Sequence, residues 1–223
     1  MLGPSERAMS NGSNTIAIIG TGNVGGALAV RLAKAGYGVR LGVREGKDQA
    51  ELLGRAGPNA SVDTPAGAAA AADVVLLAVP GKVAVEAAKA LGDLTGKVIV
   101  DTTNPVAWNA GPVLAAPAEG SNAAALAAAL PGARVVKAFS TFGAEFHADP
   151  SLPGGPVDVQ IAGDDAAAKH TVSAIAERTG FTPIDVGPLR NAALLESLAV
   201  LWIHLATVGG RGRDAAFKLV SRK

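Results

Sequence analysis

The chain has 223 residues, a formal net charge of only +1 and no cysteine; 49% of it is hydrophobic but only 4% aromatic. The near-neutral charge argues against a nucleic-acid or membrane partner, and the absence of cysteine excludes disulfides, thiol catalysis and cysteine-ligated metals. No run reaches the ~18 consecutive apolar residues typical of a membrane span, so we expect a soluble, cytoplasmic protein with an aliphatic, alanine-rich core.

The N-terminal segment, residues 1–14, is polar and lacks the continuous apolar stretch of a secretion signal. We interpret it as a disordered leader or an expression remnant. The three histidines of the chain, His147, His170 and His204, are dispersed and show no metal-ligand spacing. No metal site is therefore expected.

The segment 15–44 reads as strand, glycine-rich turn, helix, turn and strand. This order is the context in which the pattern G-x-G-x-x-G indicates dinucleotide binding. Gly20 permits the tight turn, Gly22 lets the backbone approach a pyrophosphate, and Gly25 lets the helix pack closely on the strand. The helix N-terminus then presents backbone amides to phosphate groups. The predicted cofactor-binding residues of this turn are Gly20, Thr21, Gly22, Asn23, Val24 and Gly25.

The end of the second strand indicates which dinucleotide is bound. An NAD site usually places Asp or Glu there to accept from the ribose hydroxyls, whereas this chain has Val43 and Arg44, followed by Lys47. A guanidinium can pair with a 2′-phosphate through charge-assisted hydrogen bonds. These three residues therefore favour NADP(H), and the alternative for the two cations is an ordinary solvated loop.

The rest of the chain alternates apolar strands with helical patterns. Helices are expected at about 47–55, 66–72, 83–91, 121–130, 166–179 and 189–208, strands at 73–79, 97–101, 133–139, 157–163 and 181–186, a short strand near Ser61, and a long loop at 106–120. The predicted fold is α/β: a Rossmann doubly wound parallel sheet with a small C-terminal α/β extension that ends in an apolar helix. We expect residues 15–150 to form an NADP-binding Rossmann domain and residues 151–223 a small part packed on it.

Ligands of such sheets bind beyond the carboxyl ends of the strands. Ala78, Val79 and Pro80, which follow the strand 73–79, are therefore expected to approach the cofactor. Asn104 follows the next strand and can hydrogen-bond a nicotinamide ribose or carboxamide, with a simple Asx or proline turn as the alternative. Asp101 is expected either to hold this turn or to touch a ligand, and the loop 106–120 is expected to cover the pocket.

Seven blocks of the sequence resemble a known family. They are Ile18–Gly26, Leu41–Arg44, Val100–Pro105, Val135–Phe139, Ile161–Asp165, Asp185–Leu189 and Leu195–Leu198. Together they are similar to the NADPH-dependent reductases of the deazaflavin coenzyme F-420, and also to the oxidoreductase domains of the six-transmembrane ferric reductases. The segment Phe139–Gly143 is closer to the ferric-reductase type.

The resemblance implies an NADP(H)-dependent oxidoreductase, commonly dimeric, that transfers hydride between NADPH and a flavin-like acceptor, either deazaflavin coenzyme F-420 or a flavin. It implies that Thr21 and Asn23 line the pyrophosphate, that Arg44 holds the 2′-phosphate, and that Val79 and Pro80 border the nicotinamide. Val43 stands where a phosphate-contacting serine is common in the family, and Lys47 is offset by one from the family's basic residue.

Hydride transfer between stacked rings requires no protein nucleophile and no metal, so no catalytic side chain is predicted. Two other functions stay open: a non-catalytic NADP(H)-binding or sensor protein, and a dehydrogenase of a small acid or alcohol. The dehydrogenase lacks a convincing proton donor, because the C-terminal helix contains no lysine. His204 is expected to pack or cap this helix, and His147 to lie in a solvent-exposed loop.

Overall fold

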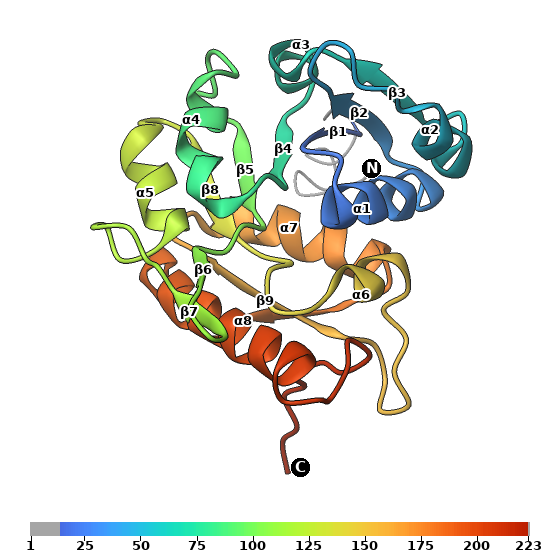
Figure 1. The fold of residues 1–223 in the computed structure, drawn as a ribbon. Helices are drawn as coiled ribbons and strands as arrows, with labels where there is room; N and C mark the ends of the chain where they lie inside the picture. Colours follow the sequence, from blue (N-terminus) through green and yellow to red (C-terminus); the bar gives the residue numbers. More distant parts are fainter. Residues whose placement is uncertain (1–13, 223) are drawn as a thin grey trace, which may run out of the picture.

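A computed structural model of the chain describes residues 14–222. The expected leader lies outside the described residues except for Asn14, whose side-chain amide donates to the carbonyl oxygen of Gly36 at 2.9 Å. The described residues form one eight-stranded sheet in the order β10-β9-β8-β5-β4-β1-β2-β3, with helices on both of its faces (Figure 1). This architecture confirms the predicted fold class.

The first six sheet strands along the chain are parallel and follow the Rossmann order 3-2-1-4-5-6. The bounds of the eight are β1 Thr15–Ile19, β2 Gly38–Gly42, β3 Ala60–Asp63, β4 Val74–Leu77, β5 Val98–Asp101, β8 Arg134–Lys137, β9 Asp158–Gly163 and β10 Thr182–Asp185. The short strand expected near Ser61 is β3. One departure from a parallel sheet occurs at β9, which pairs antiparallel with β8, while β10 is parallel to β9.

The helices complete two cores, one on each face of the sheet. Their bounds are α1 Asn23–Lys34, α2 Ala50–Ala56, α3 Pro65–Ala70, α4 Ala84–Lys89, α5 Asn122–Ala129, α6 Ala144–Ala148, α7 Ala166–Arg178 and α8 Ala192–Thr207, with short 3₁₀ turns η2 Gly81–Val83 and η3 Leu189–Asn191. In β1, Ile16 and Ile18 enter the core with α1, α2 and α7, whereas Ala17 and Ile19 enter the core with α3, α4 and α5. Successive strand side chains point to opposite faces, so both faces must be apolar to be covered.

The sequence also accounts for where helices begin. Thr64 caps α3 by accepting a hydrogen bond from the amide of Gly67 at 3.0 Å, and Pro65 occupies the first helical position. Asp165 caps α7 in the same way through the amide of Ala168. The helix expected from Lys47 begins three residues later, at Ala50, because the preceding residues turn and Asp48 accepts from the Ala50 amide.

Two segments expected to be loops are ordered elements. The segment 106–120 contains an antiparallel hairpin, β6 Val106–Trp108 and β7 Pro112–Leu114, which lies beside α8 (Figure 1). Its strands are only three residues long, too short for an alternating pattern to be read from the sequence. The second is the segment around His147, which forms α6 and packs against α1.

Candidate functional site

The glycine-rich turn has the geometry that the sequence motif predicts. Gly20 adopts φ +100°, a left-handed conformation that glycine tolerates, and a Cβ there would lie 2.4 Å from the Ala78 carbonyl oxygen. A Cβ on Gly25 would lie 1.9 Å from the Gly20 carbonyl oxygen. Gly22 is exposed and a Cβ there would meet nothing within 4 Å. The turn is therefore closed toward the protein and open toward solvent.

Gly22 is also the N-cap residue of α1, and it offers no side chain to the first-turn amides. Asn23 and Val24 form that first turn, and Thr21 precedes the cap. Because uncapped N–H groups at a helix start attract anions, this twelve-residue helix is suited to a phosphate group. The open space at Gly22 and the free amides together fit a pyrophosphate.

The end of β4 lies directly against this turn. The amide of Ala78 donates to the Ile19 carbonyl at 2.8 Å, and Val79 is the next nearest neighbour of Gly20. Pro80 is exposed and precedes η2, where a Cβ on Gly81 would lie 2.2 Å from the Asn104 carbonyl oxygen. The structure thus brings the predicted residues Ala78 and Val79 to the glycine turn, and Pro80 to the neighbourhood of Asn104.

The predicted cations lie beyond the end of the neighbouring strand β2. Val43 is buried and its amide donates to the Asp63 carbonyl at 2.9 Å, whereas Arg44 and Lys47 are exposed in the following turn. Among residues 14–222, neither cation forms a salt bridge to a carboxylate. Both charges are therefore available to an anion.

The ends of β5 and β8 meet through Asn104. Its side-chain nitrogen donates to the Ser140 carbonyl at 2.8 Å. Within the described part of the chain, the Asn104 Oδ1 and the Ser140 Oγ are buried atoms with no hydrogen-bond partner. Buried polar atoms are rarely left unpaired in folded proteins, and both of these atoms belong to residues that follow neighbouring strands of the sheet.

A buried cluster of charged side chains joins the ends of β5 and β8 to α8, and it was not predicted from the sequence. The Lys137 Nζ at the end of β8 lies 2.9 Å from Asp101 Oδ2 and 2.8 Å from Glu196 Oε1 of α8, and all three side chains are fully buried. Lys137 also donates to the Thr103 carbonyl, and Asp101 Oδ1 accepts from the Thr103 amide at 2.8 Å. Asp101 therefore holds the turn through this cluster, which is one of the two roles expected of it.

Glu196 links the cluster to a third element. Its carboxylate accepts from the backbone amide of Asn122, at the start of α5, at 3.0 Å. The Asn122 side chain in turn donates to Thr103 Oγ1 at 2.8 Å. Burial raises the pKa of the Glu196 carboxyl, while the Lys137 ammonium acts in the opposite direction. The signals in the sequence were a lysine ending the run Val135–Val136 and a glutamate inside an apolar helix, because charged residues in such positions are buried only when paired.

The prediction for His147 was wrong. His147 lies in α6 and is fully buried, with Nδ1 3.0 Å from the Gly143 carbonyl and Nε2 3.0 Å from the Phe139 carbonyl. Burial lowers its pKa to about 4, against the effect of these hydrogen bonds. The imidazole is thus a neutral brace for the segment 139–143. His204, expected to be packed or capping, is exposed on α8.

The predicted residues therefore line one edge of the sheet. Across the sheet, β2 is followed by Arg44 and Lys47, and its neighbour β1 is followed by the glycine turn. Next come β4, followed by Ala78–Pro80, then β5, followed by Asn104, and finally β8, followed by Ser140. Such a row suits an elongated ligand with a phosphate end, a central pyrophosphate and a polar ring at the far end. That the residues contact a dinucleotide stays a prediction.

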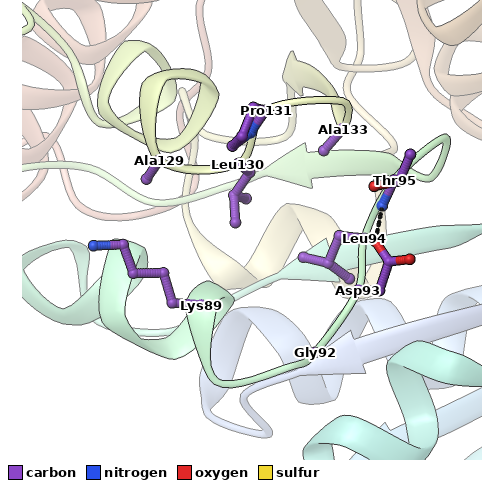
Figure 2. Close-up of a pocket in the computed structure, with 9 residues that line it drawn as sticks. All are labelled: Lys89, Gly92, Asp93, Leu94, Thr95, Ala129, Leu130, Pro131 and Ala133. Atoms are coloured by element: carbon purple, nitrogen blue, oxygen red, sulfur yellow. Dashed lines mark hydrogen bonds between the residues drawn. The ribbon is translucent and has the colours of Figure 1, made fainter.

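A separate hollow of about 210 Å³ lies at the opposite edge of the sheet, ahead of the strands β5 and β8 (Figure 2). Leu94 and Leu130 line it together with Lys89 and Asp93, and the Asp93 carboxylate accepts from the Thr95 amide at 2.9 Å. Among the residues that line it, no titratable group is buried. The hollow is therefore unconnected with the row of strand ends described above.

This chain is similar to proteins that are described as NADP reductases. Residues 15–105 match the family described as NADP oxidoreductase coenzyme F420-dependent. The F420-dependent NADP reductase of Methanothermobacter thermautotrophicus is 32% identical over 221 residues, which cover 92% of this chain and 94% of that protein. A solved structure from Arthrobacter sp. FB24, described as a candidate F420-dependent NADP-reductase, has a TM-score of 0.83 at 32% identity and covers 92% of this chain and 99% of that one.

Another relative is much longer than this chain. Metalloreductase STEAP3 of Rattus norvegicus is 34% identical over 188 residues, which cover 82% of this chain but only 36% of that protein. This chain therefore spans little more than a third of the metalloreductase that it matches.

Proposed function

Because this chain belongs to the family of F420-dependent NADP reductases, we propose that it is an NADP(H)-dependent oxidoreductase that transfers hydride between NADPH and a flavin-like acceptor. The observation that carries the proposal is the row of strand ends: an amide-lined turn open at Gly22 follows β1, and Arg44, which forms no salt bridge within residues 14–222, follows the neighbouring strand β2. The family resemblance found in the sequence is confirmed by the relative that matches along almost its whole length.

In this proposal each part of the row binds one part of the cofactor. Arg44 and Lys47 hold the 2′-phosphate, the turn Gly20–Gly25 holds the pyrophosphate, and Ala78–Pro80 with Asn104 border the nicotinamide. Bound NADPH would supply the hydride. The chain's own contribution is to orient the two reacting rings and to keep water from them, which is how proteins serve cofactor chemistry.

The buried cluster argues against the dehydrogenase alternative. Lys137 is the last residue of β8, but its side chain is fully buried and held by Asp101, Glu196 and the Thr103 carbonyl. A lysine in these contacts has no path to a substrate oxygen and cannot act as its proton donor. Hydride transfer to a ring, which needs no such donor, fits the site better.

The test of the cofactor assignment is a comparison of two arginines of one segment. We expect Arg44→Ala to weaken NADPH binding by about 10- to 100-fold, because a charge-assisted contact is lost, and to change NADH binding little. Arg40→Ala, which removes an exposed arginine from the body of β2, is the control and should change neither. Equal losses for NADPH and NADH in the Arg44 variant, measured by calorimetry, would contradict the assignment.

The acceptor is proposed to be deazaflavin coenzyme F-420 or a flavin. A spectrophotometric screen of NADPH oxidation with these acceptors and a ferric chelate, with NADH in parallel, identifies it. Turnover with a ring acceptor supports hydride transfer. Saturable NADPH binding without turnover on any acceptor would favour the alternative of a non-catalytic NADP(H)-binding or sensor protein.

We also propose that the protein is a homodimer whose interface includes α8 and the β6–β7 hairpin. These neighbouring elements expose Leu194, Leu201, Trp108 and Val113, and apolar surface of this kind marks interfaces. Light scattering should show a dimer for the wild type and a monomer for Leu201→Glu. A monomeric wild type at micromolar concentration would refute the proposal.

The segment Leu189–Thr207, which includes α8, is long and apolar enough to cross a membrane, and 39% of its most apolar window is buried inside the protein. Trp202 and Leu195 are among its buried residues, and the Trp202 indole donates to the Ala215 carbonyl at 2.5 Å. We propose that α8 is a packed helix of a soluble, cytoplasmic protein. Recovery of the expressed chain in the membrane fraction after carbonate extraction would contradict this.

A further inference from the structure

We propose that the buried cluster of Asp101, Lys137 and Glu196 carries a net negative charge that favours binding of the oxidised nucleotide, NADP⁺, over NADPH. The proposal rests on the proposed NADP(H) site and gives an electrostatic role to three side chains that do not touch the ligand. It concerns the ratio of the two affinities, whereas the proposed site concerns the binding of either nucleotide.

The first observation is the number of charges in the cluster. Lys137 Nζ lies 2.9 Å from Asp101 Oδ2 and 2.8 Å from Glu196 Oε1, and all three side chains are fully buried. Among residues 14–222, Lys137 is the one cation that forms a salt bridge with either carboxylate. Two carboxylates paired with one ammonium leave one negative charge without a counterion.

The second observation is the set of hydrogen bonds, which favours the ionised form of both carboxyl groups. Asp101 Oδ1 accepts from the Thr103 amide at 2.8 Å, and Asp101 Oδ2 accepts from Lys137. The Glu196 oxygens accept from the Asn122 amide at 3.0 and 3.2 Å, and Oε1 also accepts from Lys137. Within the described part of the chain these partners are all donors, so a proton on either carboxyl group would face a donor and find no acceptor. The cluster therefore keeps a net charge of −1, although burial raises the pKa of Glu196 against the effect of Lys137.

The third observation is the place of this charge. Asp101 and Lys137 are the last residues of the neighbouring strands β5 and β8. Lys137 also donates to the carbonyl of Thr103, the residue directly before Asn104, which borders the nicotinamide in the proposed site. Since consecutive Cα atoms are about 3.8 Å apart, the cluster lies roughly 10 Å from the expected ring. Because the three side chains are buried, water screens this charge less than a charge on the surface.

The two forms of the nucleotide differ in the charge of the nicotinamide ring. When the C4–H bond breaks, the hydride carries two electrons and one proton to the proposed acceptor, and the ring changes from neutral to +1. The phosphate groups are the same in both forms. A buried negative charge near the ring therefore stabilises bound NADP⁺ relative to bound NADPH. The same preference makes bound NADPH a stronger hydride donor.

The test is a calorimetric comparison of the dissociation constants of NADP⁺ and NADPH, with no acceptor present. Glu196→Gln removes one negative charge and keeps the shape of the side chain and an oxygen that can accept from Lys137. The affinity for NADP⁺ should fall about 3- to 10-fold relative to that for NADPH, as expected for a unit charge at about 10 Å and an effective dielectric constant of about 20. A tenfold change corresponds to about 30 mV in the midpoint potential of the bound two-electron couple.

Asp101→Asn is the second variant, because it neutralises the other carboxylate of the cluster. It should shift the ratio of the two affinities in the same direction as Glu196→Gln. This variant keeps the proposal falsifiable if Glu196→Gln is too unstable to measure. Circular dichroism of each variant verifies folding before the nucleotides are titrated.

Two control variants separate the charge of the cluster from other effects. Asp185→Asn also neutralises a lysine-paired carboxylate, since Asp185 Oδ2 lies 2.8 Å from Lys169 Nζ, but this side chain is 57% exposed and ends β10, an outermost strand of the sheet. Water and salt screen such a charge, so the ratio should stay at its wild-type value. Thr103→Val removes the hydroxyl that accepts from Asn122 Nδ2 at 2.8 Å and leaves every charge in place. It should weaken the binding of both nucleotides by the same factor.

The outcomes separate this proposal from the one on which it rests. A ratio that shifts toward NADPH in the neutralised variants and holds in both controls supports the electrostatic role. An unchanged ratio in the neutralised variants, or a shift toward NADP⁺, overturns it even if NADPH binding depends on Arg44. A shift of equal size in Asp185→Asn or Thr103→Val also overturns it, because total charge or local structure would then set the ratio. Absence of binding of either nucleotide to the wild type would refute the cofactor site itself, and this proposal with it.

Discussion

The glycine turn and the Lys137 cluster lie at the same edge of one sheet but are built in opposite ways. The turn occupies six consecutive residues and functions through missing side chains, since Gly20 and Gly25 leave no space for a Cβ. The cluster joins Asp101, Lys137 and Glu196, whose separations along the chain are 36 and 59 residues, through three buried charges. One region is local and open, and the other is non-local and closed.

The difference indicates which region can bind a ligand and which one stabilises the fold. The free amides of the glycine turn have polar capacity left over, which a ligand can use. In the cluster, each charged side chain is already paired, so nothing remains for a ligand, but the cluster ties β5, β8, α5 and α8 together. Changes in the turn should therefore alter binding, and changes in the cluster should alter stability.

The largest expected effect follows from removing the cation of the cluster. Lys137→Met leaves two buried carboxylates without their counterion, and breaking a buried pair in this way costs about 3–5 kcal/mol. Chemical denaturation should show this loss. The control is Lys169→Met, which breaks a partly exposed pair with Asp185 and should cost less than about 1 kcal/mol. Similar losses in both variants would show that burial does not distinguish the two pairs.

The same contrast explains what could be predicted from the sequence. The glycine turn, the strand order and the place of Arg44 were readable because each depends on residues close together in the chain and on the right-handed crossovers of parallel strands. The cluster was not, because local patterns do not show that Lys137 and Glu196 meet. The left-handed backbone of Phe139 and the Ser140 hydroxyl, which has no hydrogen-bond partner among residues 14–222, are likewise visible only in the folded structure.

Sequence patterns also failed where packing overrides local preference. A histidine in a short polar-looking segment is usually exposed, but His147 is buried by the aromatic residues Phe139 and Phe142, which lie against its ring. The β6–β7 hairpin forms beside α8, whose contact cannot be read from the hairpin's own residues. In both cases the deciding partner lies elsewhere in the chain.

The next largest effect concerns acid. Because burial lowers the pKa of His147 to about 4 from 6.5, the unfolded chain binds more protons than the folded one between these values. Neutral His147 therefore costs the folded state nothing above pH 6.5, and the free energy of unfolding falls by about 3 kcal/mol as the pH falls toward 4. Denaturation at pH 4 to 7 should show a shallower acid decline in His147→Gln than in the wild type. Parallel declines would place the acid sensitivity in other groups.

A smaller effect of opposite sign is expected at Glu196. Burial raises the pKa of this carboxyl above its ordinary 4.5, although Lys137 limits the shift, so the folded chain binds more protons than the unfolded one. The stabilisation of the folded state that comes from this extra proton is complete below pH 4.5 and is lost as the pH rises through the raised pKa of Glu196.

The advantage of the wild type over Glu196→Gln should therefore shrink as the pH rises. The opposite holds for Glu145, whose pKa is lowered by its hydrogen bond from Arg213, so the advantage over Glu145→Gln should grow. Denaturation of both variants over about pH 3 to 8 measures the two slopes, because the change at Glu145 falls below its ordinary pKa of 4.5 and the change at Glu196 falls above it. If the stability difference between wild type and variant changed with pH in the same direction for both variants, the charge environment assigned to the cluster would be incorrect.

The smallest effect on stability is expected in the glycine turn, at Gly22. This residue has φ −74° and open space where a Cβ would lie, so Gly22→Ala should change the free energy of unfolding by less than about 0.5 kcal/mol. In the proposed site the added methyl would occupy the approach of the pyrophosphate, and NADPH affinity should fall about tenfold or more. Gly54→Ala, inside α2 and also in open space, should stabilise the fold by about 0.5–1 kcal/mol and leave the affinity unchanged. A Gly22 variant that binds NADPH as tightly as the wild type would remove the turn from the binding site, whatever its stability.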